Sequence, residues 1–371
     1  MFIWLACTPE EEGGDKLNAQ AGDTADTGEP VTYEGCRATP APDGERVVLV
    51  SLPYGPGGRQ ANVYARLSLS AEGELTDLGE RFEMGRAYSG EIVFTPDGSL
   101  GIAVQDDGTL GIFLADGTVI DPAFGDFYAS KVVMDPTGEV AWVVDGNWAN
   151  NGGGIYRVPL DCATGTPGAP ERVIEAKLPA DLLLREDMAV LVGLEVPGST
   201  EGDDAALLTW GDAPAFVAGV DAFGDDEAFV TDGHWVGDYL FIADYSEFSG
   251  VPTRVAVVDT HDQLDPYTVI DVEDPVALVP AGDLVLVLSG YGDAVYAIDA
   301  DGGTSARWVS QSELPGGGAS ITRGDLDGLV LVAEVSGLRT LRVSGTEVSD
   351  EGVFSLGSSY EGITGAVGVQ P

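Results

Sequence analysis

The chain has 371 residues, and a hydrophobic fraction of 44% is ample for a large buried core. Its 62 acidic residues against 17 basic ones give a formal net charge of −45, and only three of the basic residues are lysines. A field of this sign repels phosphate backbones and anionic headgroups, so we expect no nucleic-acid partner. The 52 glycines and 21 prolines interrupt short apolar runs throughout, which is typical of an all-β chain.

The N-terminal segment begins with a short apolar run that ends in Leu5-Ala6-Cys7 and continues into a polar stretch up to Pro30. This stretch has too few apolar residues to fold. The arrangement resembles the lipobox of bacterial lipoproteins, in which the cysteine becomes the lipidated N-terminus. No basic residue precedes the apolar run and the run is short, which indicates a true start upstream of Met1.

The leader sets our expectations for domains and localisation. We divide the chain into residues 1–32, an acidic disordered spacer behind the lipobox-like start, and residues 33–371, a single folded domain. The resemblance implies an exported protein, lipid-anchored to the bacterial cell envelope at the outer membrane and facing the periplasm or the surface. Membrane contact would then occur only through the lipid. We expect the domain to be a monomer.

Three cysteines are present, at positions 7, 36 and 162. If Cys7 is acylated, Cys36 and Cys162 remain as a pair in an oxidising compartment. A disulfide between them and two free buried thiols are both compatible with the sequence.

An internal repeat organises the folded domain. Seven segments, spaced about 40 to 53 residues apart, share a strand, a polar turn, a second apolar strand, a third strand and a weaker fourth. The predicted second strands are Val47–Leu52, Leu100–Asp106, Val140–Gly146, Met188–Glu195, Asp238–Tyr245, Asp283–Gly290 and Gly328–Val335. The predicted third strands are Asn62–Leu69, Leu110–Ala115, Gly153–Leu160, Ala206–Trp210, Thr253–Thr260, Asp293–Ala300 and Gly337–Ser344. Sheets of this size bury both faces by stacking around a ring, so we predict a seven-bladed β-propeller of four-stranded antiparallel blades.

The turns that precede the second strands carry a family resemblance. Thr95-Pro96-Asp97-Gly98 and Asp135-Pro136-Thr137-Gly138 place Pro and Gly where a type I turn favours them, and Ala41-Pro42-Asp43-Gly44 does the same. These repeats are similar to those of the YVTN and lactonase-like seven-bladed propellers. The family includes sugar lactonases and many non-enzymatic surface proteins, so the resemblance implies a fold rather than an activity.

Two segments resemble a first strand and could close the ring, residues 33–39 and residues 360–369. One of the two should complete the blade whose other strands come from the opposite end of the chain. Such a clasp protects the edge at which a ring would open.

The ends of the second strands are predicted to lie on one rim of the ring. The residues at these ends include five carboxylates, which are Asp106, Asp145, Glu195, Asp244 and Glu334. Calcium or another divalent cation needs several oxygen ligands, and convergent carboxylates would supply them. Acidic residues at strand ends also accept hydrogen bonds from nearby backbone, and this structural role is the competing interpretation.

Aromatic and amide residues follow the same strand ends. The candidates for ligand contact are Tyr54, Asp145, Trp148, Asn150, Tyr245 and Tyr291. Flat rings on glycine-rich loops are typical of recognition surfaces. No P-loop, nucleophile elbow or dinucleotide fingerprint is present, and the two histidines lie at different points of the repeat. We therefore favour a non-enzymatic envelope protein that binds a glycan, peptide or protein partner; the alternative is a metal-dependent, lactonase-like hydrolase.

Overall fold

The computed structural model describes the greater part of the repeat region. The described residues are 44–55, 58–85, 91–105, 107–114, 117–124, 128–146, 153–185, 188–200, 202–211, 214–224, 228–245, 253–260, 265–290, 294–299, 304–309, 317–321, 324–335, 337–357 and 364–371. Within them the structure is almost entirely antiparallel β-sheet, and it contains no helix long and apolar enough to cross a membrane.

The described strands form five four-stranded sheets and one eight-stranded sheet. The eight-stranded sheet divides at β12, and with this division the described strands fall into seven four-stranded units, numbered here in chain order. From the inside outward, unit 1 contains β28 (Val367–Val369), β1 (Arg46–Tyr54), β2 (Gln60–Leu69) and β3 (Leu75–Glu83); unit 2 contains β4 (Ile92–Phe94), β5 (Leu100–Val104), β6 (Leu110–Leu114) and β7 (Val119–Ile120).

Units 3 and 4 share a strand. Unit 3 contains β8 (Ala129–Met134), β9 (Val140–Asp145), β10 (Gly153–Asp161) and the first part of β12 (Glu171–Arg185), with β11 (Thr166–Pro167) paired to β10 beside it; unit 4 contains the second part of β12, β13 (Met188–Glu195), β14 (Ala205–Thr209) and β15 (Ala215–Val220). The first part of β12 pairs with β10 and the second part with β13. Leu178, at the junction, has a φ of 53°, a conformation that a residue with a side chain rarely adopts.

The remaining units have the regular four-stranded order. Unit 5 contains β16 (Val230–Val236), β17 (Tyr239–Asp244), β18 (Arg254–Asp259) and β19 (Asp265–Asp271); unit 6 contains β20 (Pro275–Ala281), β21 (Leu284–Ser289), β22 (Ala294–Asp299) and β23 (Thr304–Val309); unit 7 contains β24 (Gly318–Ser320), β25 (Leu329–Glu334), β26 (Gly337–Ser344) and β27 (Glu347–Phe354). A short 3₁₀ helix, Gly324–Leu326, precedes β25.

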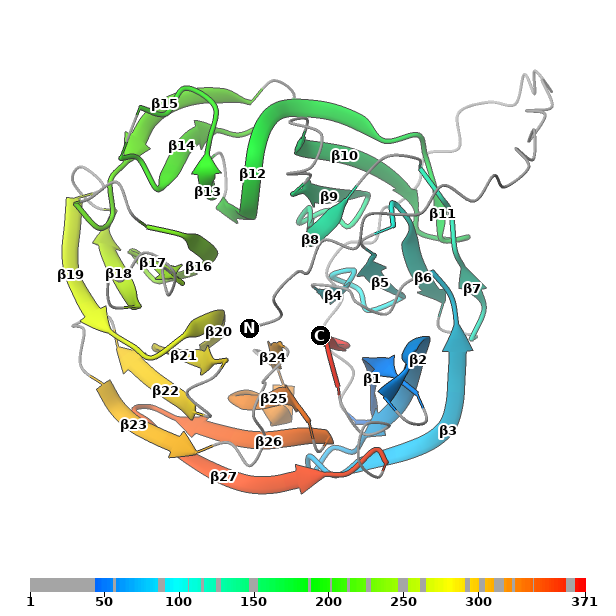
Figure 1. Ribbon diagram of the computed structural model, residues 1–371. Coiled ribbons are helices and arrows are strands. Elements are labelled where there is room, and N and C mark those ends of the chain that lie inside the picture. Colours follow the sequence, from blue (N-terminus) through cyan, green and yellow to red (C-terminus); the bar gives the residue numbers. More distant parts are fainter. Residues whose placement is uncertain are drawn as a thin grey trace, which may run out of the picture.

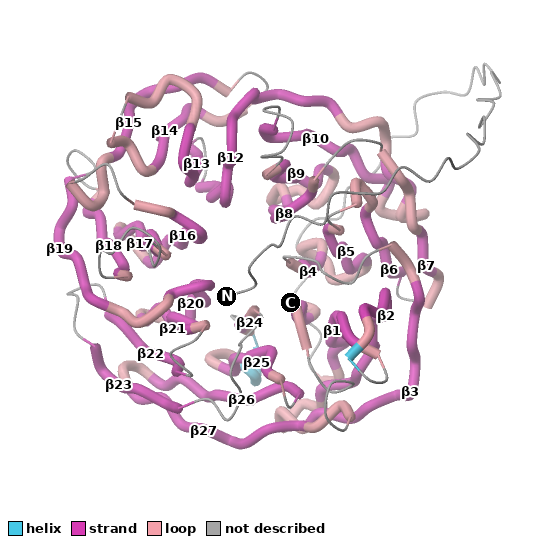
Figure 2. Tube along the Cα trace, viewed as in Figure 1, coloured by secondary structure: helices cyan, strands magenta, loops and turns pink. Residues whose placement is uncertain are grey.

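The units are arranged radially, with the first strand of each nearest the centre of the ring and the fourth at its circumference (Figures 1 and 2). This arrangement is a β-propeller and confirms the predicted fold class. Each predicted second strand overlaps an observed one, from β1 to β25. Two of the three expected turns are also present, since Gly98 N–H donates to the Thr95 carbonyl and Gly138 N–H to that of Asp135, with φ values of 69° and 74° at the glycines. Residues 41–43 of the third expected turn lie outside the described residues.

The hydrophobic core is divided among the contacts between neighbouring units. Seven clusters of buried residues are found in the described part of the chain, and each combines residues of two adjacent units. One of them joins unit 7 to unit 1 through Leu331 and Leu338 on one side and Val50 and Leu67 on the other. The apolar packing therefore continues around the whole ring. The second strands are buried on both faces along most of their length, whereas outer strands such as β3 and β27 are largely exposed.

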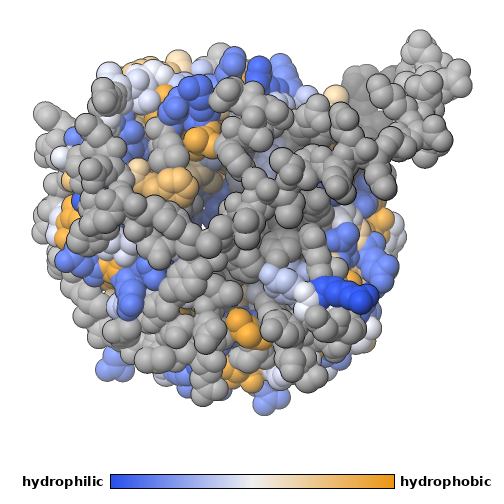
Figure 3. All heavy atoms as spheres, in the orientation of Figure 1, coloured by the Kyte–Doolittle hydropathy of each residue, from blue (hydrophilic) through white to orange (hydrophobic). Residues whose placement is uncertain are grey.

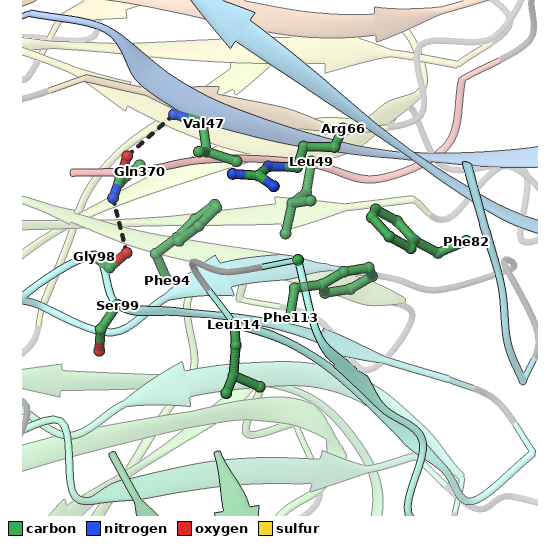
Figure 4. Close-up of a pocket in the computed structure, with 11 residues that line it drawn as sticks. Val47, Leu49, Arg66, Phe82, Phe94, Gly98, Ser99, Phe113, Leu114 and Gln370 are labelled. Atoms are coloured by element: carbon green, nitrogen blue, oxygen red, sulfur yellow. Dashed lines mark hydrogen bonds between the residues drawn. The ribbon is translucent and has the colours of Figure 1, made fainter. Parts of the chain in front are cut away.

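The C-terminal strand closes the ring. β28 pairs antiparallel with β1, so residues from the two ends of the described chain share one sheet. Ser51 Oγ accepts a hydrogen bond from Ala366 N–H at 2.7 Å. The side chain of Gln370 accepts from Val47 N–H at 3.1 Å and donates to the Gly98 carbonyl at 2.9 Å, which links unit 1 to unit 2 (Figure 4). Of the two segments predicted for closure, the C-terminal one has this role, and residues 33–39 lie outside the described residues.

Candidate functional site

The ladder registers show which residue ends the second strand at the same point of each unit. In four units the residue at this point pairs with the inner strand just before a bulge; the pairs are Asp145 with Ala129, Gly193 with Pro179, Asp244 with Val230 and Ser289 with Pro275. Glu195 is therefore not equivalent to Asp145, because β13 continues for two residues past Gly193. The prediction for Glu195 is wrong in this respect. Its carboxylate is largely exposed and pairs with Lys177 at 2.5 Å.

Asp106 lies outside the described residues, and the buried residue before it is Gln105, directly after β5. The Gln105 side chain donates to the Tyr64 hydroxyl at 3.2 Å and to the Met84 carbonyl at 3.3 Å. In unit 2 the end of the second strand is thus occupied by a buried amide that bonds to the neighbouring unit.

The three other predicted carboxylates are buried and bonded within their own units. Asp145 Oδ1 accepts from Tyr128 N–H at 2.9 Å, and Asp244 Oδ1 accepts from Phe229 N–H at 2.8 Å. The second oxygen of Asp244 pairs with Arg254 at 2.8 Å, and Glu334 pairs with Arg339 at 2.5 Å. These acids hold the backbone that leads into the inner strand, or an arginine of the third strand, which is the structural role that competed with metal binding.

The described carboxylates of the rim do not form a shared site. Among the residues that the structure describes, no group of three or more His, Cys, Asp and Glu side chains is placed to hold a metal ion. A divalent cation held by Asp145, Asp244 and Glu334 together is therefore not supported.

Of the aromatic and amide candidates, Trp148, Asn150 and Tyr291 lie outside the described residues. Tyr54 is half-buried at the end of β1. Tyr245 directly follows β17 and exposes only 8% of its surface, so it offers little area to a ligand. The exposed aromatic residue next to this position is Phe229, which is 47% exposed and lies just before β16.

A second set of charged residues lies on the innermost strands, and we call it the axial cluster. It consists of Glu91, directly before β4, Lys131 on β8, Asp181 on β12 and Asp232 on β16. The Lys131 ammonium donates to Asp232 Oδ1 at 2.9 Å. Because β12 lies between β8 and β16 in the ring, this ion pair passes the inner strand of unit 4 and joins units 3 and 5 (Figure 1).

Each carboxylate of the axial cluster also binds the backbone of a following unit. Glu91 accepts from Val132 N–H at 3.2 Å, Asp181 from Gly233 N–H at 3.3 Å and Asp232 from Leu278 N–H at 2.6 Å. The cluster thus connects the inner strands from unit 2 to unit 6.

Burial and mutual contact govern the protonation of the axial cluster. Burial raises the pKa of Asp181 well above its usual value, and the Asp232 carboxylate adds to this effect. Burial also raises the pKa of Glu91. Burial opposes the charge of Lys131, but Asp232, Glu91 and Asp181 outweigh it and raise the pKa of Lys131. For Asp232, burial is outweighed by the Lys131 ammonium, so its pKa is lowered. The Lys131–Asp232 pair is therefore ionised, while Asp181 is biased towards its protonated form.

The axial cluster can supply hydrogen bonds at the inner edge of the ring. Lys131 has three N–H donors, its side chain is 19% exposed, and its hydrogen-bond partner among the described residues is Asp232. Sequence reasoning missed this set, although a signal existed: Lys131 is one of three lysines in the chain, and it interrupts the apolar strand β8.

The sulfur of Cys162 is in a disulfide bond. The chain has only two other cysteines, so the partner is Cys7 or Cys36, and both lie outside the described residues. Cys162 directly follows β10 in unit 3.

Where residues are coloured in Figure 3, apolar ones form small separate areas between hydrophilic ones. The large apolar side chains most exposed in the described part of the chain are Leu78, Met188, Phe216, Val217, Phe229 and Val269. They belong to three different units, and scattered exposure of this kind is ordinary for a protein surface.

The fold and the closed ring define the class of the protein, a β-propeller. No family model and no curated protein matches the sequence. Solved structures with similar folds include a functionally unknown protein from Desulfotomaculum acetoxidans, with a TM-score of 0.58 and 12% identity over 87% of this chain and 98% of that one. Apo AztD from Citrobacter koseri has a TM-score of 0.56 and 13% identity, covering 88% of this chain and 97% of that one.

A third similar structure is PorZ of Porphyromonas gingivalis, described as an essential bacterial surface component of the type-IX secretion system. Its TM-score is 0.54 at 13% identity, and the match covers 88% of this chain and 39% of PorZ. At such identities the likeness concerns the fold alone, and all three comparisons agree with the propeller architecture.

Proposed function

We propose that this chain is an exported, non-enzymatic binding protein whose seven units are the blades of one propeller. The observation that carries the proposal is the role of the strand-end acids. Asp145 and Asp244 are each bonded to the backbone that enters an inner strand, so they fix the ends of rim loops instead of offering free carboxylates for chemistry. Loops fixed on a rigid scaffold are the usual place of recognition residues.

The partner we propose is a glycan, a peptide or a protein of the envelope or the extracellular space. Phe229 supplies exposed apolar area at the strand ends, and Lys131 supplies N–H donors at the inner edge of the ring. Trp148, Asn150 and Tyr291 remain candidates from the sequence on the same rim. The net charge of −45 favours neutral or basic partners over anionic ones.

The proposed location is the bacterial cell envelope. Residues 1–32 would form a spacer behind a lipid on Cys7, and residues 33–371 would form the propeller. An acylated Cys7 has no thiol left, so the partner of Cys162 would then be Cys36. The disulfide at Cys162 supports export, because such bonds persist in oxidising compartments. The Pro-Asp-Gly turn at Gly98 supports the YVTN and lactonase-like resemblance.

Binding is tested with the purified full chain on a glycan array and by crosslinking to envelope extract. We expect a ligand whose capture is reduced at least about tenfold by Trp148→Ala, a size typical for loss of a contact residue. Leu78→Ala, an exposed apolar residue of the outer strand β3, is the matched control and should bind as the unsubstituted chain does. A ligand that is captured equally by all three proteins would contradict the assignment of binding to this rim.

Anchoring is tested separately. Cys7→Ser should move the protein from the membrane fraction to the soluble fraction and abolish incorporation of a labelled fatty acid, whereas Cys36→Ser should leave both unchanged. Retention of Cys7→Ser in the membrane would reject the lipid anchor and leave the binding proposal unaffected.

A further inference from the structure

The segment that leads from unit 4 to unit 5 is held by one buried carboxylate. Asp204, directly before β14, is 6% exposed, and its Oδ2 accepts hydrogen bonds from Ala222 N–H at 2.7 Å and from Phe223 N–H at 3.2 Å. Ala222 and Phe223 follow β15, at the start of the connection to β16. We call these three residues the Asp204 latch.

The latch lies next to the charged residues that end the second strand of unit 5. The guanidinium of Arg254 lies 4.6 Å from the centre of the Phe223 ring, and it forms an ion pair with Asp244 at 2.8 Å. Asp244 in turn accepts from Phe229 N–H. The contacts of the latch therefore extend from the third strand of unit 4 to the entry of the inner strand of unit 5.

Among the residues that the structure describes, no cationic side chain is bonded to Asp204. The hydrogen bonds that its carboxyl group accepts from these residues come from two backbone N–H groups, and the nearby carboxylates of Asp221 and Asp244 disfavour a further negative charge there. Arg254 is paired with Asp244 instead. Burial raises the pKa of Asp204 to about 7, while the two N–H donors act in the opposite direction.

We propose that the Asp204 latch holds residues 221–224 in place in a pH-dependent way. The latch is closed when Asp204 is protonated, and its hold is weakened when this buried carboxyl becomes an anion. The inference does not depend on any ligand of the propeller. The physical reason is linkage. Once the latch opens, Asp204 is hydrated and ionises near its ordinary pKa of 3.8, so a rise in pH between that value and about 7 favours the open state. Above about pH 7 both states are ionised and the effect levels off.

The test is hydrogen exchange of peptides that contain Ala222 and Phe223, measured by mass spectrometry from pH 5 to pH 9 and corrected for intrinsic exchange. In the unsubstituted chain, the opening constant should rise by about tenfold per pH unit up to about pH 7 and then stay level. A profile that is flat below pH 7, or that continues to rise above it, would overturn the proposal.

Two variants separate the latch from general effects of charge. Asp204→Asn keeps an oxygen that can accept both N–H bonds, because both reach the same oxygen in Asp204, and it should make the opening constant independent of pH. Asp203→Asn, at the neighbouring position, should keep the pH-dependent rise. A variant Asp204→Asn that still shows the rise would assign the titration to another group. The profile of the unsubstituted chain decides the question even if a variant fails to fold.

Discussion

The ion pair of the axial cluster predicts a large loss of stability when its lysine is removed. Lys131→Met keeps most of the aliphatic length but leaves Asp232, whose side chain is 4% exposed, without its cation. Removal of one partner from a buried pair costs about 3–5 kcal/mol, and since Lys131 is 19% exposed we expect the lower end, about 3 kcal/mol. Because the pair joins unit 3 to unit 5 past unit 4, the loss should affect unfolding of the ring as a whole.

The assay is urea denaturation followed by tryptophan fluorescence and by circular dichroism. Lys177→Met is the matched control, because Lys177 and Glu195 form an exposed pair, 51% and 57% accessible, which should contribute less than about 1 kcal/mol. Adding Asp232→Asn to Lys131→Met should recover part of the loss, since an amide oxygen can still accept from Leu278 N–H. If Lys131→Met destabilises the chain no more than Lys177→Met does, the Lys131–Asp232 pair contributes no more to the free energy of unfolding than an exposed ion pair, and the prediction is refuted.

Three further predictions concern the closed ring and its packing. Ser51→Ala should lower the free energy of unfolding by about 1–3 kcal/mol, because it removes a buried hydrogen bond to the closing strand. Ser289→Ala is the comparison, because the buried Ser289 hydroxyl has no hydrogen-bond partner within the described part of the chain; it should lower this free energy by less than about 0.5 kcal/mol in urea titrations. Gln370→Ala should lower it by about 1–2 kcal/mol through loss of two side-chain bonds, and an unchanged urea midpoint would contradict this role in closure. Val47→Ile should be neutral or stabilising by up to about 0.8 kcal/mol, since Val47 lines a cavity of about 30 Å³ that can take an added methylene (Figure 4). Val48→Ile, at a fully buried position, should instead destabilise the chain by about 1–3 kcal/mol. Equal shifts of the melting temperature in the two variants would argue against the cavity.

The repeat could be predicted from the sequence because the second strands are continuous apolar runs bounded by turn residues. The predicted second strand Met188–Glu195 coincides with β13, and the predicted third strand Gly337–Ser344 coincides with β26. Both strands are buried along most of their length, so the hydrophobic pattern and the strand have the same limits.

The rim positions were less predictable, because sequence spacing does not reveal strand register. In unit 4 the bulge at Ala180 and the longer β13 put Gly193 at the end position, two residues before Glu195.

The axial cluster could not be predicted from the sequence for a different reason. Lys131 and Asp232 are 101 positions apart and belong to units that are not adjacent, so only the curvature of the ring brings their charges together.

The shared strand β12 makes one side of the ring different from the rest. Between units 5 and 6, by contrast, residues 272–274 separate β19 from β20, and a connection of this kind can change in length without disturbing either sheet. Between units 3 and 4 the backbone passes from one sheet to the other within a single run of 15 residues. An insertion near Leu178 would shift the register of two sheets at once and displace Asp181. The junction of units 3 and 4 at β12 is therefore where the ring should be least tolerant of an insertion or of recombination between repeats. At this junction the continuous strand also provides no loop whose length could vary to contact a partner.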